Sequence, residues 1–292
     1  MQLGAIFPQT EIGADPVAVR DFAQAAEGLG YEHLLVFDHV LGADASKREQ
    51  WERPYSHTDV FHEPFVLFGY LAALTEKIQM TTGILILPQR QTALVAKQAA
   101  AVDVLTGGRL RLGIGIGWND VEYEALGENF KNRGSRSAEQ IELLKMFWTQ
   151  DVVNFDGRYH KISHAGINPL PVQRPIPIWM GAGAPGKPAG PDRVLQRVGR
   201  LADGYFPLCE AGHTARTLIE TVKGHAEAAG RDPDDLKIEG RIDLVGSPED
   251  WKTALDAWEE LGADLVSIGT ARAEFHTTDD HIQAIKAFKD IT

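Results

Sequence analysis

The sequence predicts a single (β/α)8 barrel, an α/β TIM-barrel domain over residues 1–292, and three observations lead to this fold. Eight short apolar segments alternate with eight segments of helical periodicity. At the centre, residues 78–88 and 109–118 are β-branched runs one helix apart, the pattern of a parallel βαβ unit. The length of 292 residues is also sufficient, because such a barrel takes about 250 residues plus insertions.

The expected elements follow in strict alternation. Asp15-Pro16 and Ser247-Pro248 each place a capping residue before a proline suited to the first helical position. The main rival is a doubly wound open sheet, which should have G-x-G-x-x-G after its first strand, where this chain has PQTEIGAD. We expect strands at 3–7, 33–37, 78–88, 109–118, 176–180, 204–206, 237–245 and 264–268, and helices at 16–29, 65–72, 89–108, 137–148, 193–201, 214–229, 248–261 and from Thr277 or Thr278 to 289.

Two segments interrupt the alternation and are interpreted as insertions on the barrel rim. Residues 40–62 form a polar, aromatic-rich connection that is too long for an ordinary loop, which makes it a candidate lid. Residues 151–175 contain Asp156-Gly157, a hairpin signal, and end in a proline-rich stretch.

Glycines stand in the two central strands where side chains are usual, at Gly83, Gly113, Gly115 and Gly117. Glycine weakens a strand, so something is expected to approach the backbone there. A planar ring or phosphate-bearing cofactor would be one reason. Relief of crowding inside the barrel would be another, and the sequence favours neither.

Composition excludes several function classes. The formal net charge is −12, with 29 Lys and Arg against 41 Asp and Glu and no dense basic run, which disfavours nucleic acid and anionic membranes as partners. Cys209 is the single cysteine, so an intrachain disulfide is impossible and a reducing, cytoplasmic setting fits. No run of about 18 apolar residues suggests a membrane span, and the first residues do not read as a secretory signal.

Chemistry in such a barrel belongs at the carboxyl ends of the strands. Asp38-His39 is the one adjacent titratable pair there; histidine moves protons near neutral pH, but the pair would equally suit a loop-stabilising role. The glycine-rich stretch 181–190 would offer backbone N–H groups to a phosphate, or would simply be a loop. No histidine motif indicates a metal site and no G-x-S-x-G indicates a serine nucleophile.

The segments GAIFPQ, LLVFDHV, TTGILILP, the block from RLRLGIGIGW to LLKMFWT, PLPVQRPIPIWMGAG and LADGYFP together resemble the bacterial luciferase-like monooxygenase superfamily. Within it the chain is most similar to the branch of oxidoreductases that use the deazaflavin coenzyme F420. The resemblance extends to about residue 206. It implies a (β/α)8 barrel that holds a flavin or deazaflavin at the strand ends.

The resemblance also implies site residues. Gly83-Ile84 matches a bulge with a cis peptide bond that lies behind the ring. Asp38 matches a polar contact to the cofactor, and His39 a proton donor or orienting group beside the ring. The backbone stretch that meets the tail phosphate matches Gly181, Ala182, Gly183 and Ala184.

The substrate side departs from the family's sugar-phosphate dehydrogenases. Those have a tryptophan shortly after the histidine, whereas Val40 follows His39 here and the first tryptophan is Trp51. Sugar phosphate is therefore not expected, and Trp51, Trp118 and Asn119, with Tyr55 and Phe61, are candidates for an apolar aromatic pocket. Glu122 and Glu124 suggest acid–base chemistry, but ion pairs with the nearby Arg133 and Arg136 are the expectation.

The sequence thus favours an F420-dependent oxidoreductase that passes hydride between C5 of the deazaflavin and a small organic molecule, with His39 handling the proton. The alternatives are a monooxygenase that takes reduced FMN from a separate reductase, and a barrel that binds a flavin without turnover. By resemblance we expect a homodimer.

Overall fold

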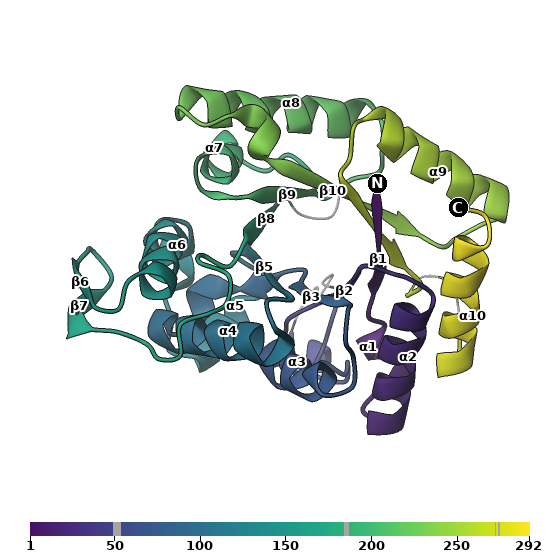
Figure 1. Cartoon of the computed structure of the whole chain (residues 1–292), viewed down its shortest axis with the longest axis horizontal. Coiled ribbons are helices and arrows are strands. Elements are labelled where there is room, and N and C mark those ends of the chain that lie inside the picture. The colour runs from purple at the N-terminus through teal and green to yellow at the C-terminus, as the bar shows by residue number, and fades with distance from the viewer. Residues whose placement is uncertain (49–53, 184–186, 272, 274) are drawn as a thin grey trace.

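The computed structural model describes residues 1–48, 54–183, 187–271, 273 and 275–292. Within these residues, eight parallel strands close into a barrel in the order β1–β2–β3–β5–β8–β9–β10–β11, and β11 pairs back to β1 (Figure 1). The predicted (β/α)8 barrel is confirmed, and closure excludes the open sheet. The barrel strands are β1 (Gln2–Ile6), β2 (His33–Val36), β3 (Gln79–Thr82), β5 (Leu110–Gly115), β8 (Ile178–Ala182), β9 (Gly204–Pro207), β10 (Lys237–Asp243) and β11 (Leu265–Gly269).

Helices surround the barrel, and the last of them packs beside α2 (Figure 1). The long helices are α2 (Pro16–Gly28), α3 (Pro64–Ala72), α4 (Thr92–Thr106), α6 (Arg133–Thr149), α7 (Asp192–Leu201), α8 (His213–Ala228), α9 (Pro248–Glu260) and α10 (Thr278–Lys289). Short helices are α1 (Gln9–Ile12) and α5 (Asp120–Ala125), with 3-10 turns at Ala45–Lys47, Leu87–Gln89, Phe130–Asn132 and Pro233–Asp235.

Capping side chains fix the starts of several helices as the sequence predicts. Asp15 accepts a hydrogen bond from the amide of Val17, and Ser247 forms a reciprocal capping box with Asp250. Thr277, rather than Thr278, caps α10. Helix α6 begins at Arg133, four residues before the expected start. The expected start was too late because the first turn is polar and the buried apolar stripe begins only after it.

The barrel interior holds a buried polar group below the carboxyl ends of the strands. Nε2 of His33 lies 2.9 Å from Glu239, and a guanidinium nitrogen of Arg111 lies 2.7 Å from the same carboxylate. Burial opposes ionisation of Glu239, but His33 and Arg111 outweigh it and lower the pKa of this carboxyl to about 2. The Arg111 guanidinium also stacks 4.4 Å from the Trp179 ring. This layer fills the interior and leaves the mouth of the barrel for a ligand.

The central glycines make room for protein atoms. The Gly83-Ile84 peptide bond is cis, as predicted, and β4 (Leu85–Ile86) continues on the far side of it against β5. A Cβ on Gly113 would lie 1.9 Å from the carbonyl oxygen of Thr82, and one on Gly115 would lie 1.9 Å from Cδ1 of Ile84. For these two glycines, relief of crowding is the explanation that the structure supports.

An antiparallel pair of strands stands apart from the barrel sheet beside α6 (Figure 1). It joins β6 (Val153–Asp156) to β7 (Lys161–Ala165), and the amide of Gly157 donates to the carbonyl of His160 at the turn. The hairpin signal at Asp156-Gly157 is therefore confirmed.

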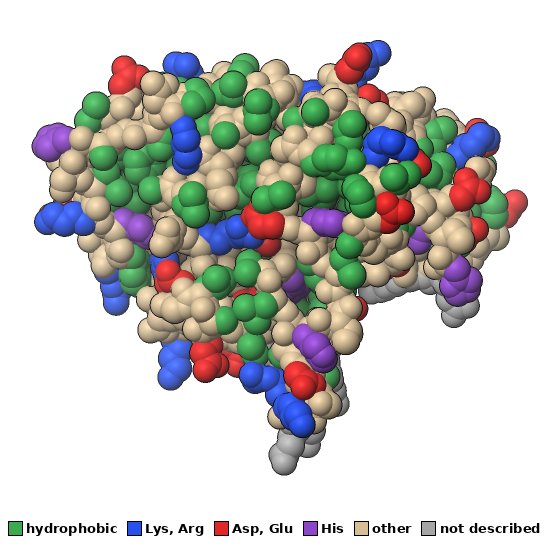
Figure 2. Space-filling model, turned by 90° about the horizontal axis from the view of Figure 1, so that it is seen from below, with side chains coloured by type: hydrophobic (Ala, Val, Ile, Leu, Met, Phe, Trp, Pro, Cys, Tyr) green, Lys and Arg blue, Asp and Glu red, His purple; other side chains and the backbone are tan. Residues whose placement is uncertain are grey.

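The molecular surface agrees with the acidic composition. On the face in Figure 2, Lys and Arg side chains are scattered among acidic, hydrophobic and neutral groups and form no continuous patch. Among the described residues, no helix is both long and apolar enough to cross a membrane.

Replacing Gly113 by alanine should destabilise the fold by about 1–3 kcal/mol, because the new methyl group would overlap the Thr82 carbonyl in a packed interior. The urea unfolding midpoint, followed by circular dichroism, measures the effect. Gly224→Ala in α8 is the control: no atom lies within 4 Å of its Cβ position, and alanine should stabilise the helix by about 0.5–1 kcal/mol. Equal midpoints for the two variants would contradict this account.

Candidate active site

The carboxyl ends of β2, β4, β5 and β8 bring the candidate residues to one end of the barrel, since parallel strands end on the same side. Asp38 and His39 follow β2 after one intervening residue, Phe37. Their side chains have different surroundings, so each is described separately.

Asp38 is an internal anchor. Its side chain has no exposed surface, accepts a hydrogen bond of 2.9 Å from the amide of Ile86, and pairs at 2.7 Å with Arg90. Arg90 also pairs with Glu63 at 2.8 Å. Burial acts against the charge of Arg90, but the two carboxylates prevail and raise the pKa of the guanidinium above its usual value. Asp38 thus fixes the segment after the cis peptide bond and has no surface with which to contact a ligand directly.

His39 is held by a buried carboxylate from a distant part of the chain. Nδ1 of His39 lies 3.2 and 3.3 Å from the two oxygens of Glu122 in α5, and the Glu122 side chain has no exposed surface. The same carboxylate accepts hydrogen bonds from the amides of Val40, at 2.7 Å, and Leu41, at 3.3 Å. A carboxylate can only accept, so Nδ1 carries a proton toward it, and Nε2 is the nitrogen left for other chemistry.

Aromatic rings surround the imidazole of His39. The ring centroids of Phe61, Tyr55 and Trp118 lie 4.8, 5.2 and 5.4 Å from that of His39. Apolar walls of this kind limit the access of water to the histidine. Trp51, also expected in this pocket, lies outside the described residues.

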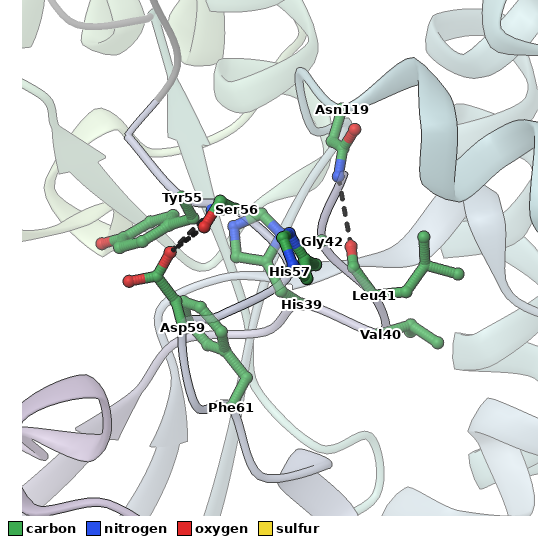
Figure 3. Close-up of a pocket in the computed structure, with 10 residues that line it drawn as sticks. All are labelled: His39, Val40, Leu41, Gly42, Tyr55, Ser56, His57, Asp59, Phe61 and Asn119. Carbon is green, nitrogen blue, oxygen red and sulfur yellow. Dashed lines mark hydrogen bonds between the residues drawn. The ribbon is translucent and has the colours of Figure 1, made fainter. Parts of the chain in front are cut away.

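A cavity of about 280 Å3 opens beside His39. Figure 3 shows Tyr55 and Phe61 on one side of it and Asn119 with Leu41 on the other. This volume is at the lower end of the range for ligand sites, so the cavity suits a small organic molecule rather than an entire flavin. Its lining consists of His39, Val40, Leu41, Gly42, Tyr55, Ser56, His57, Asp59, Phe61 and Asn119.

Asn119 supports the cavity wall in two ways. Its side-chain oxygen accepts a hydrogen bond from the amide of Val121 and so caps α5. Its side-chain nitrogen donates a hydrogen bond of 3.3 Å to the carbonyl of Leu41. The residue therefore lines the cavity and joins the start of α5 to the loop after His39.

The barrel mouth has a partly exposed apolar surface. Ile84 lies against Gly115 and Gly181, and Gly181 pairs in register with Phe206 of β9; Gly83, Ile84, Gly181 and Phe206 are all partly accessible. Ala182 is buried, whereas Gly183 is exposed with a φ of 95°. Ala184 lies outside the described residues. No cluster of three potential metal ligands occurs in the part of the chain that the structure describes.

Glu122 is the residue whose partner sequence analysis misassigned. We expected ion pairs of Glu122 or Glu124 with Arg133 and Arg136. For Glu122 this expectation is wrong, because its carboxylate contacts His39, while Arg136 pairs with Glu128. The signal in the sequence was weak, because Glu122 lies in the first turn of a short helix and 83 positions from its partner.

Removal of the Glu122 carboxylate should loosen the loop after His39, because the Val40 and Leu41 amides would lose their acceptor in a buried setting. We expect Glu122→Ala to destabilise the chain by roughly 1–3 kcal/mol and to speed hydrogen exchange at these two amides. Glu124→Ala, at an exposed position on the same helix, is the control and should stay within about 0.5 kcal/mol of the parent. Unchanged exchange at Val40 in the Glu122 variant would disprove the anchoring role.

Comparison with known proteins identifies the family of the chain and agrees with its fold. The model of the luciferase-like monooxygenase family matches residues 3–241. A Mycobacterium tuberculosis protein of uncharacterised function is 34% identical over 214 residues, 72% of this chain and 71% of that protein. The F420-dependent glucose-6-phosphate dehydrogenase of Gordonia bronchialis is 33% identical over 249 residues, 80% of this chain and 67% of the enzyme. An FMNH2-dependent dimethylsulfone monooxygenase of Pseudomonas putida is 32% identical over 219 residues, 72% and 54% of the two chains.

Solved structures share the fold at low identity. The monooxygenase RslO1 from Streptomyces bottropensis superposes with a TM-score of 0.81 at 17% identity, covering 99% of this chain and 98% of its own. An F420-dependent secondary alcohol dehydrogenase, in complex with an F420-acetone adduct, gives 0.78 at 17% identity, with 100% and 98% covered. The family match and the relatives above 30% identity decide the assignment: the chain belongs to the luciferase-like monooxygenase family and is an oxidoreductase.

Proposed function

We propose that the chain is an F420-dependent oxidoreductase that transfers hydride between C5 of the deazaflavin and a small organic substrate. The observation that supports this most is His39, whose Nδ1 is fixed by a buried carboxylate while Nε2 has no hydrogen-bond partner among the described residues. A histidine held in this way can give or take the proton that accompanies a hydride.

The barrel mouth fits a flat ring. Ile84, Gly181 and Phe206 offer an apolar surface that is partly exposed at the strand ends, where a tricyclic ring would cover it. Asp38 would act indirectly, by fixing the segment behind that surface through Ile86 and Arg90. When bound, the deazaflavin would supply the hydride-accepting or hydride-donating carbon, and the protein would supply orientation and a dry face.

The roles of the surrounding residues follow from their contacts. Glu122 would keep the proton of His39 on Nδ1, which leaves Nε2 as the nitrogen that exchanges a proton with the substrate. Phe61, Tyr55 and Trp118 exclude water from the imidazole. The cavity would place a substrate beside His39, so that proton and hydride would be exchanged on the same molecule.

A small alcohol, carbonyl or unsaturated compound suits the cavity better than a sugar phosphate. None of the described residues that line it is Lys or Arg, and Asp59 adds a negative charge. A phosphate would therefore meet no Lys or Arg among the described lining residues. Identity with glucose-6-phosphate dehydrogenases supports the cofactor class more than the substrate.

A monooxygenase that uses reduced FMN from a separate reductase is the second candidate, favoured by the FMNH2-dependent relative. A flavin-binding barrel without turnover is the third. The expectation of a homodimer in a reducing, cytoplasmic setting belongs to the same proposal.

Titration of the purified chain with F420 and with FMN, each oxidised and reduced and followed by fluorescence or absorbance, tests the cofactor. We expect F420 to bind at least tenfold more tightly, a difference of about 1.4 kcal/mol. Preference for reduced FMN would reject the deazaflavin in favour of oxygen-dependent chemistry. Binding of neither ligand would contradict all three candidates, because each of them binds a flavin or a deazaflavin.

Substitution of His39 by alanine should lower turnover by about 100-fold or more, because proton transfer at the reacting centre is lost. Cofactor affinity should change by less than about threefold, since the ring surface at Ile84 and Phe206 is intact. Steady-state rates with a panel of secondary alcohols and ketones, together with cofactor titration, measure both. His57→Ala is the control, an exposed histidine in the same cavity lining. Wild-type turnover in the His39 variant would exclude it as the proton-handling residue.

A further inference from the structure

Three arginines gather where helices α6 and α7 begin. Arg133 is the first residue of α6, and Arg193 and Arg197 lie in the first two turns of α7. Nη2 of Arg197 lies 3.0 Å from the Cβ position of Gly134, so its guanidinium rests against the first turn of α6. Because β5 and β8 are neighbours, the helices that follow them bring these residues together at the ligand-facing end of the barrel.

The positive charge of this arginine cluster is not balanced. Among the described residues, no carboxylate lies within ion-pair distance of Arg133, Arg193 or Arg197, although Arg136 nearby pairs with Glu128. Nε of Arg133 and Nη1 of Arg197 are buried without hydrogen-bond partners. Asp192, the acid in the first turn of α7, is engaged by His225 at 2.9 Å.

Burial and the positive charges of neighbouring arginines lower the pKa values of two guanidinium groups in the cluster. Burial, and then the charges of Arg193 and Arg200, lower the pKa of Arg197 from its usual value. Burial also lowers the pKa of Arg133, and Arg193 acts in the same direction. The helix N-termini add partial positive charge, and neither Asn132 nor Pro191 provides a side-chain cap. Cations at such positions repel one another unless an anion joins them.

The cluster stands next to the end of β8. The backbone of Gly183 lies 3.5 Å from the Cβ position of Gly190, so these two residues are neighbours in space. Only Pro191 separates Gly190 from α7. The exposed Lys187 belongs to the same loop. An elongated ligand whose ring covers Gly181 would therefore reach the cluster with its tail.

We propose that Arg133, Arg193 and Arg197 form a subsite for the anionic tail of the cofactor. This inference rests on the proposed function and extends it from the ring to the tail. Three guanidinium groups match a tail with several negative charges, such as the phosphodiester and glutamate carboxylates of F420, better than the single phosphate of FMN. The subsite would then contribute to the choice between the two cofactors.

The test compares ligands that differ only in the tail. F420 and its tail-free deazaflavin fragment are titrated against the parent chain and against Arg193→Gln and Arg197→Gln, at two salt concentrations. We expect the parent to bind F420 at least tenfold more tightly than the fragment. Each variant should lose at least fivefold for F420 and less than twofold for the fragment, with a weaker salt dependence. Arg20→Gln, which removes an exposed arginine of α2, is the control and should change neither.

The outcomes separate this inference from the proposed function. Equal binding of F420 and the fragment by the parent, or equal weakening of both in the variants, would overturn the tail subsite and leave the cofactor assignment intact. If FMN binds and F420 does not, the proposed function fails. The affinities of the same variants for FMN and for riboflavin, which lacks the phosphate, then decide whether the arginines bind an anionic tail. No binding by any of the four ligands would overturn both. Circular dichroism and thermal midpoints establish that each variant is folded.

Discussion

The ion pairs from Asp38 to Arg90 and from Arg90 to Glu63 hold the ligand-facing end of the barrel together. Asp38 lies two residues after β2, and Arg90 follows β4. Glu63 caps α3 by accepting from the amide of Val66. One guanidinium therefore joins both ends of the 40–62 connection to the segment after the cis peptide bond. Removing one partner of a buried pair typically costs about 3–5 kcal/mol, because the other charge stays buried and uncompensated. The two ends of the long connection are therefore held in place by charge pairs to one side chain.

The glycines of β5 make room for the segment that contains the cis peptide bond. The strand forgoes side chains at Gly113 and Gly115 so that the Thr82 carbonyl and the Ile84 side chain can occupy its inner face. The hydroxyl of Thr82 donates a hydrogen bond of 2.6 Å to the carbonyl of Gly113. This hydrogen bond keeps the two strands close at this point. The bulge and the glycine strand thus form one packed unit, and Ile84 becomes part of the surface that faces a ligand.

Sequence reasoning predicted the barrel, most element boundaries within a few residues, and the location of Asp38-His39, because strand periodicity, capping residues and strand-end position are local properties. It did not predict the contacts that give these residues their roles. Glu122 and Arg90 are 83 and 52 positions from the residues they hold, and nearby arginines offered Glu122 a closer partner along the chain. The cis bond at Gly83-Ile84 was expected through family resemblance, since no local pattern distinguishes it. The buried layer of His33, Arg111 and Glu239 was not anticipated either, because each residue reads as an isolated polar position in its own strand.

Glu122 binds the imidazole of His39 together with two amides of the following loop, and Asn119 from the same region holds the carbonyl of Leu41. The first residues of the connection after β2 are consequently held to α5, although strands β3, β4 and β5 and helices α3 and α4 separate them along the chain. In protein engineering, these two segments should therefore be exchanged together. A chimaera that carries residues 40–62 of this chain into another barrel should also carry residues 118–126, because the transplanted loop would otherwise arrive without the carboxylate that binds its first amides.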